Sequence, residues 1–197
     1  NVSGETCPHY LLYTEEDVER LAGLGNCTPP FRTSSDQGAL WRYVAEDPTA
    51  MVVSDHSPCA PGLKVGNDFF QIWGGISGCQ STRQLLLAES ERRSIKLQTV
   101  AAVTGANMAV SFAIEGKGSI ALKDVDADLW LVDLSYESVL RPEDLMYRHP
   151  SSPHVGRTVR GRTVMTMVRG ETVFENGRVV TSKRGRMIRP AWRWRDP

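Results

Sequence analysis

The chain has 197 residues, 23 basic and 23 acidic side chains, and 41% hydrophobic residues, which is enough apolar material for one or two folded domains. The balanced charge argues against a nucleic-acid surface, because such surfaces are built from clustered Lys and Arg. No apolar run reaches the roughly 18 residues of a membrane span. Four cysteines without a C-x-x-C pair predict free thiols in a reducing cytoplasm rather than disulfides or a zinc knuckle.

Residues 1–115 alternate strand and helix signals. Apolar runs predict strands over residues 2–7, 24–28 and 51–54. Helices are expected after Thr14, after a capping box formed by Ser34 and Gln37, and over residues 80–92, 97–103 and 106–112. Such alternation predicts an α/β fold, in which parallel strands are joined by helices and ligands bind at the C-terminal ends of the strands.

The pattern changes after residue 115. Residues 127–134 predict a strand, residues 141–157 an irregular connector, and Asn176-Gly177 a type I′ hairpin. We therefore divide the chain into a barrel-like part, 1–115, and an antiparallel β segment with a basic tail, 116–197. The chain starts at Asn1 in what reads as the middle of a domain, which predicts a fragment that lacks its N-terminal part.

Two polar residues follow predicted strands and are candidates for chemistry. Asp55 ends the apolar run Met51-Val52-Val53, and His9 follows the first strand in TCPHY. Asp55 could instead cap a helix or loop, and His9 could be an ordinary core residue. An imidazole and a carboxylate at the same end of parallel strands also suit a divalent metal such as zinc, which needs at least three protein ligands. His56 is a third candidate only if it turns inward.

Four motifs in order, ETCPHYL (5–11), NCTPPFR (26–32), SDHSPC (54–59) and WGGISGCQ (73–80), resemble the cyclic amidohydrolases. This family includes allantoinases, dihydropyrimidinases (hydantoinases) and dihydroorotases. Residues 116–133 and 156–177 resemble the family's β-sandwich. The resemblance implies the last three or so strands of a (β/α)8 barrel plus a small β-sandwich segment. In the family's binuclear zinc centre it places His9 and Asp55 as metal ligands, while the carboxylated lysine and the other ligands would precede Asn1.

The resemblance also implies the chemistry. A metal-activated hydroxide would open a cyclic amide, with Asp55 as base and proton shuttle. Ser57 and His56 beside it are not expected to form a hydrolase triad. Substrate is expected to contact Thr28, Ser57, Gly74 and Gly75. For the two glycines, simple turn positions are the alternative, and Ser57 could equally cap the next segment.

The motifs resemble the allantoinase branch most. Cys59 stands where dihydroorotases commonly carry a histidine, and residues 77–80 differ from the corresponding stretch of dihydropyrimidinases. The predicted reaction is therefore hydrolysis of allantoin to allantoate by a cytoplasmic homo-oligomer, a tetramer, that acts on a small cyclic ureide. The alternatives are a hydantoinase-like ring hydrolase and a non-catalytic interaction protein with the same fold. The fragment alone is expected to be inactive.

Overall fold

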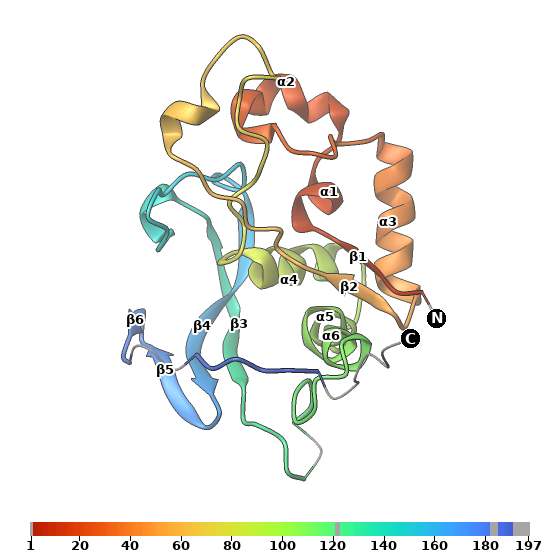
Figure 1. Cartoon of the computed structure of the whole chain (residues 1–197), viewed down its shortest axis with the longest axis vertical. Coiled ribbons are helices and arrows are strands. Elements are labelled where there is room, and N and C mark those ends of the chain that lie inside the picture. The colour runs from red at the N-terminus through yellow and green to blue at the C-terminus, as the bar shows by residue number, and fades with distance from the viewer. Residues whose placement is uncertain (1, 121–122, 182–184, 191–197) are drawn as a thin grey trace, which may run out of the picture.

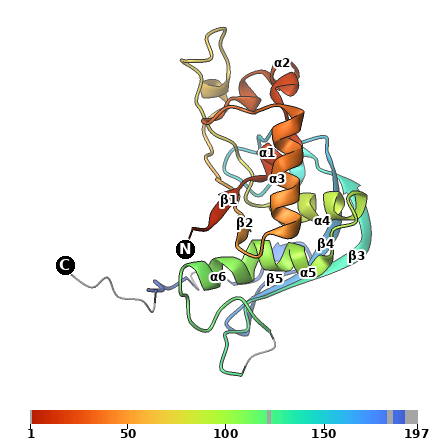
Figure 2. The same cartoon turned by 90° about the vertical axis from the view of Figure 1, so that its right-hand side faces the viewer.

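The computed structural model describes residues 2–120, 123–181 and 185–190, and shows a mixed α/β fold (Figures 1 and 2). The parts of the predicted basic tail at 182–184 and 191–197 lie outside the described residues. The N-terminal part holds two short parallel strands and most of the helices, and the C-terminal part is an antiparallel sheet.

Two parallel strands organise the N-terminal part. Strand β1 (Gly4–Thr6) pairs with β2 (Ala50–Val52), with Glu5 opposite Met51. Strand β2 is wholly buried, as expected of a parallel strand covered on both faces. The pairing continues one residue further through a hydrogen bond from Val53 N–H to Thr6 O of 2.9 Å. The C-terminal ends of both strands therefore meet at one edge.

The predicted strand at residues 24–28 is wrong. This stretch contains the 3-10 helix η2 (Ala22–Gly25) followed by irregular chain. Its backbone hydrogen bonds are not those of a strand ladder. Asn26 N–H donates to Gly23 O, and Asn26 O accepts from Gly75 N–H. Pro29 and Pro30 have no N–H to give to a sheet ladder. The described residues thus contain two parallel strands where about three were expected.

The helices follow the predicted order with shifted boundaries. Those of the N-terminal half are α1 (Pro8–Leu12), the 3-10 helix η1 (Glu15–Asp17), α2 (Val18–Leu21), α3 (Ser34–Glu46) and the 3-10 helix η3 (Pro61–Lys64). The cap of α3 lies one residue earlier than predicted, since Thr33 and Asp36 form the capping box.

Three further helical segments precede the sheet. Helix α4 spans Thr82–Arg92 and confirms the prediction for residues 80–92. Helices α5 (Leu97–Ala101) and α6 (Asn107–Ser111), predicted as separate elements, are joined without a break by the π-helical turn η4 (Ala102–Ala106).

The C-terminal part is a four-stranded antiparallel sheet in the order β3-β4-β5-β6. Its strands are β3 (Leu129–Val139), β4 (Thr158–Val168), β5 (Glu171–Glu175) and β6 (Arg178–Val179). The predicted hairpin is confirmed: Asn176 and Gly177 both have positive φ, 50° and 79°, as a type I′ turn requires. The connector between β3 and β4 includes one 3-10 turn, η5 (Pro142–Asp144).

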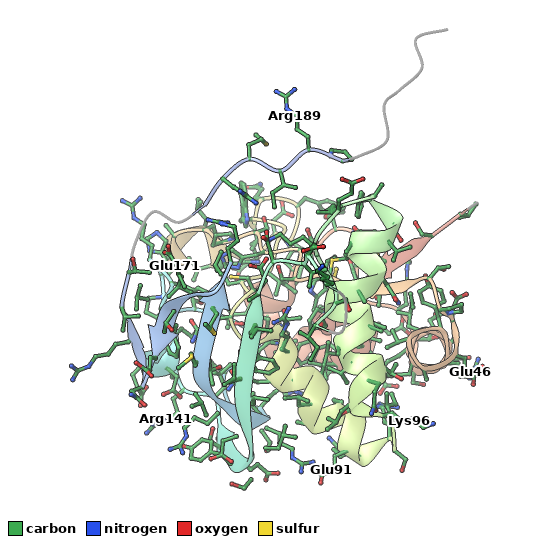
Figure 3. The ribbon with its side chains drawn as sticks, turned by 90° about the horizontal axis from the view of Figure 1, so that it is seen from below. Glu46, Glu91, Lys96, Arg141, Glu171 and Arg189 are labelled. Carbon is green, nitrogen blue, oxygen red and sulfur yellow. The ribbon has the colours of Figure 1, made fainter. Side chains whose placement is uncertain are left out.

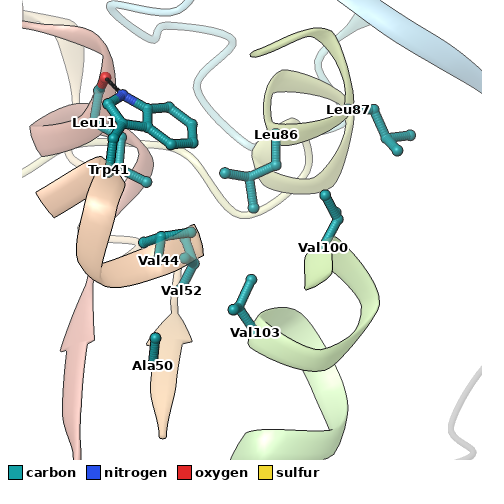
Figure 4. Close-up of a cluster of buried hydrophobic side chains, with 9 residues drawn as sticks. All are labelled: Leu11, Trp41, Val44, Ala50, Val52, Leu86, Leu87, Val100 and Val103. Atoms are coloured by element: carbon teal, nitrogen blue, oxygen red, sulfur yellow. Dashed lines mark hydrogen bonds between the residues drawn. The ribbon is translucent and has the colours of Figure 1, made fainter. Parts of the chain in front are cut away.

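One hydrophobic cluster joins the two parts (Figure 4). It contains buried side chains from α1, α3, β2, α4, α5 and the π-helical turn, and Trp130, Val132 and Leu134 of β3 pack against it. Within it, Trp41 Nε1–H donates a 2.8 Å hydrogen bond to Leu11 O. The sheet and the helical part thus share a core. The charged side chains labelled in Figure 3 lie at the periphery of the molecule.

No helix in the described part of the chain is long and apolar enough to cross a membrane.

Gly161 provides a test of the packing between the sheet and the helices. Its φ is +87°, and an added Cβ would lie 2.5 Å from Val132 Cγ2 and 3.0 Å from Leu87 Cδ1. We expect Gly161→Ala to lower the free energy of unfolding by about 2–4 kcal/mol, measured by urea denaturation. Gly170→Ala is the matched control, because Gly170 has φ +78° and open space around it, and should cost only about 1 kcal/mol. Equal losses in both variants would contradict this packing.

Candidate functional site

His9 and Asp55 come from the two parallel strands. His9 lies in the first turn of α1, three residues after β1, and Asp55 lies three residues after β2. Since the two strands are paired in parallel, both residues leave the sheet at the same edge. Helix α1 begins directly after β1 because Pro8 occupies its first position, where no backbone N–H is needed.

A third donor joins this pair. The ligand atoms of Cys7, His9 and Asp55 all lie within 4.8 Å of one another, with Cys7 and His9 buried and Asp55 exposed. Sequence reasoning named His9 and Asp55 but treated Cys7 only as a free thiol. Its position two residues before His9, at the end of the same strand, was the available signal.

His9 is buried without a hydrogen-bonding partner. Its side chain is 1% exposed, and neither Nδ1 nor Nε2 has a partner among the described residues. Burial lowers the pKa of His9 to about 4, an effect that the negative charge of Asp55 partly offsets. The imidazole is therefore neutral at pH 7 and has a free lone pair, as a metal ligand requires.

These donors fit a divalent cation. A buried imidazole with both nitrogens unpaired lacks a partner that a metal ion would supply, and a nitrogen, a carboxylate and a sulfur are all zinc ligands. Cys7 is the weakest of the three, because burial, with the charges of Asp55 and Glu5, raises the pKa of its thiol to about 12. Only the thiolate binds metal well, so Cys7 is the least suited to ligation.

Asp55 has an unusual backbone. Its φ is +44°, in the left-handed region that non-glycine residues rarely adopt and that Asp tolerates better than most. Such conformations cost free energy and cluster at functional sites. The turn directs the Asp55 carboxylate toward the Cys7 and His9 donors, as their separations show.

His56 does not join the cluster. Its Nδ1 accepts a 3.2 Å hydrogen bond from Gly78 N–H, and its ring lies 4.8 Å from that of Tyr147, centroid to centroid. The structure thus places the neighbouring side chains Asp55 and His56 in different surroundings.

The four residues predicted to contact substrate lie in two adjoining pairs. An added Cβ on Gly74 would meet Thr28 Oγ1 at 3.3 Å, and one on Gly75 would meet Ser57 Oγ at 2.4 Å. Two backbone bonds of 2.9 Å join the segments, from Gly75 N–H to Asn26 O and from Ser57 N–H to Ile76 O. Gly75 therefore has a packing reason to lack a side chain. Contact with substrate remains a prediction for all four residues.

A second buried histidine, His154, was missed by sequence reasoning. It is 0% exposed, and its ring stacks on that of Tyr13 at 5.6 Å between centroids. The Tyr13 hydroxyl donates to Pro153 O at 2.8 Å, so its contact of 3.1 Å with His154 Nδ1 assigns the ring proton to Nδ1. Burial, with lesser effects of His9 and Arg157, lowers the pKa of His154 to about 3.

The chain is similar to known proteins in sequence. The chain is 51% identical over 191 residues to an allantoinase from Rubrobacter xylanophilus and 44% identical over 187 residues to one from Desulfitobacterium hafniense. This chain is a homologue of the allantoinases. The matches cover 96% and 94% of this chain, but 42% and 41% of the relatives. The chain thus spans less than half the length of these relatives.

Solved structures show the same likeness. An L-hydantoinase (dihydropyrimidinase) from Arthrobacter aurescens aligns with a TM-score of 0.82 and 29% identity, over 91% of this chain and 41% of that one. A dihydropyrimidinase from Brevibacillus agri aligns with a TM-score of 0.82 and 28% identity, over the same shares of the two chains. No family model matches the chain. The allantoinase homologue therefore shares its fold with part of the cyclic amidohydrolases.

The buried histidines predict how stability changes with pH. The pKa of His154 is lower in the folded chain than the ordinary value of 6.5, so the unfolded chain takes up the proton first as the pH falls. The free energy of unfolding that depends on a neutral, buried His154 is therefore fully present above pH 6.5 and is lost progressively as the pH falls below that value. Glutamine is neutral at every pH in this range. In metal-free protein we therefore expect His154→Gln to reduce the slope of the free energy of unfolding against pH by about 1.4 kcal/mol per pH unit between pH 6 and pH 4. Urea denaturation at a series of pH values measures this, and an unchanged slope would contradict a neutral buried His154.

Proposed function

We propose that this chain is the part of a cyclic amidohydrolase that supplies the Asp55 proton carrier and one histidine of its metal centre. In this proposal the activity is hydrolysis of the ring amide of allantoin to allantoate. The observation that carries it is the convergence of Cys7, His9 and Asp55 within 4.8 Å, in a chain 51% identical to an allantoinase over nearly its whole length.

His9 and Asp55 would hold a divalent metal, zinc by resemblance, together with ligands supplied by residues outside this chain. When bound, such a metal would polarise the amide carbonyl and lower the pKa of a coordinated water. Ligation needs a neutral imidazole, and burial keeps His9 in that form at pH 7, while the Asp55 side chain is exposed and accessible.

Asp55 has the features of the proton carrier. Its carboxylate is exposed at the edge where a substrate would arrive, while His9 is buried. In the proposed reaction a carboxylate oxygen of Asp55 accepts a proton from water as the water oxygen bonds to the ring carbonyl carbon. The same oxygen then returns that proton to the ring nitrogen as the C–N bond breaks. The products are a carboxylic acid, which releases its remaining proton to solvent, and an N–H group on the opened chain.

The neighbouring segments would bind the ring. Thr28, Ser57, Gly74 and Gly75 adjoin one another, and Gly74 is exposed with no side chain to hold a ligand away from its backbone. A flat ring with alternating N–H and C=O groups suits contacts with backbone amides. Cys59 offers no positive charge for a substrate carboxylate, which supports a neutral ureide over dihydroorotate. By the same resemblance we expect a cytoplasmic homotetramer.

A hydantoinase or dihydropyrimidinase activity is the second candidate. The TM-scores of 0.82 with an L-hydantoinase and a dihydropyrimidinase favour it. These structures align at 28–29% identity, whereas the curated allantoinases align at 36–51%. The sequence likeness therefore favours allantoin.

Asp55 can be tested directly in the complete protein. We expect Asp55→Ala to reduce kcat for the ring substrate by at least about 100-fold, because general-base catalysis contributes about 10²–10⁴. The fold should persist, as judged by circular dichroism. His56→Gln is the matched neighbour control and should keep kcat within about tenfold, since His56 contacts Gly78 and Tyr147 instead. Retained turnover in Asp55→Ala would refute the assigned role.

Substrate choice and metal content can be measured together. The complete protein should bind about two zinc ions per chain and hydrolyse allantoin faster than hydantoin or dihydrouracil, compared side by side as kcat/KM. The 197-residue chain alone should show no turnover. Preference for hydantoin or dihydrouracil would replace the first candidate by the second. Absence of both metal and turnover would favour a non-catalytic interaction protein.

A further inference from the structure

A single lysine joins two of the three segments that carry the predicted ring-binding residues. The Lys64 Nζ lies 3.0 Å from Asn26 O, 2.9 Å from Trp73 O and 2.5 Å from Gly75 O. An ammonium group has three N–H donors, so these three carbonyls use all of them. No carboxylate of the described residues forms an ion pair with Lys64, so the main-chain carbonyls are the partners that compensate its charge.

The backbone around Lys64 is built to hold it there. Gly23 packs so closely that an added Cβ would lie 1.9 Å from Lys64 O. Trp73 N–H donates to Leu63 O at 2.9 Å, and the Asn26 side chain donates to Phe69 O and Ile72 O, both at 3.0 Å. The loop of residues 61–76, yellow at the top of Figure 1, is thereby folded against the chain near α2. Partial burial lowers the pKa of Lys64, which nonetheless keeps all three contacts of a charged amine.

The three carbonyls set the direction of the neighbouring amides. In a planar trans peptide the C=O of one residue and the N–H of the next point in opposite directions. With Trp73 O turned toward Lys64, the Gly74 N–H must point away from it. That N–H makes no hydrogen bond within the described residues, and Gly74 is exposed. The lysine thus occupies carbonyl acceptors and leaves the amide donor of Gly74 free, at a residue where an added Cβ would lie 3.3 Å from Thr28 Oγ1.

We propose that Lys64 is a positioning residue for substrate recognition: its ammonium group holds the 26–28 and 73–76 segments together so that the Gly74 N–H is presented to a ring carbonyl. The proposal rests on the proposed function for its ring substrate. Lys64 itself touches none of the donors of the metal cluster, so its effect belongs to binding rather than to proton transfer.

The test uses the complete protein with Lys64→Met, which keeps the length of the side chain but loses the charge. We expect KM for the ring substrate to rise at least about tenfold while kcat stays within about threefold and zinc content is unchanged, because the lost contacts serve binding. Amide hydrogen exchange should become faster in peptides covering residues 26–28 and 73–76. Lys64→Arg keeps a charged donor, so its KM should lie between that of wild type and that of Lys64→Met.

Lys96→Met is the matched control, because Lys96 is an exposed lysine at the molecular periphery (Figure 3). The proposal would be overturned if Lys64→Met had the same amide hydrogen-exchange rates and the same KM as this control. A fall in kcat that parallels a loss of zinc would also overturn it. If wild type hydrolyses no ring substrate, the proposed function fails. Exchange in the two segments then decides whether Lys64 holds them together.

Discussion

Three residues of parallel pairing between β1 and β2 support the whole candidate site. Asp55 is far along the chain from Cys7 and His9, and the three meet because Thr6 lies opposite Val52 and the next bond joins Val53 N–H to Thr6 O. A shift of this register by one residue would move every side chain of the strand to the opposite face. Ala50, Met51 and Val52 are all buried, so the pairing lies inside the core.

The site combines a buried ligand with an accessible one. Burial keeps His9 neutral, which is the form that binds a cation. An imidazole buried without a hydrogen-bonding partner costs free energy, and a bound cation would supply that partner. Asp55 stays in contact with solvent on a left-handed turn. The division suits a site in which one residue anchors a metal and the other also carries a proton.

Main-chain groups dominate the contacts of the loop of residues 61–76. Lys64 neutralises three carbonyl dipoles at once, and Asn26 ties the same loop through its side chain and its backbone. A loop without regular secondary structure can hold a defined shape in this way, because its polar groups are satisfied by one another. Recognition of a flat ring by backbone amides requires such a fixed loop, and glycines that allow close approach.

The sequence alone determined the elements whose signals are local. The buried strand before Asp55, helix α4 and the Asn176-Gly177 hairpin follow from apolar runs, helical periodicity and turn chemistry, and all three are present. The order of the motifs likewise indicated the family. Tertiary contacts decided the rest. Asn26–Thr28 is not a strand, because the partners of Asn26 O are Lys64 and Gly75, which lie 38 and 49 positions away along the chain. Cys7 joins the candidate metal ligands only because β2 brings Asp55 beside it. Such contacts depend on which segments pack together in space, and no local pattern of residues records that.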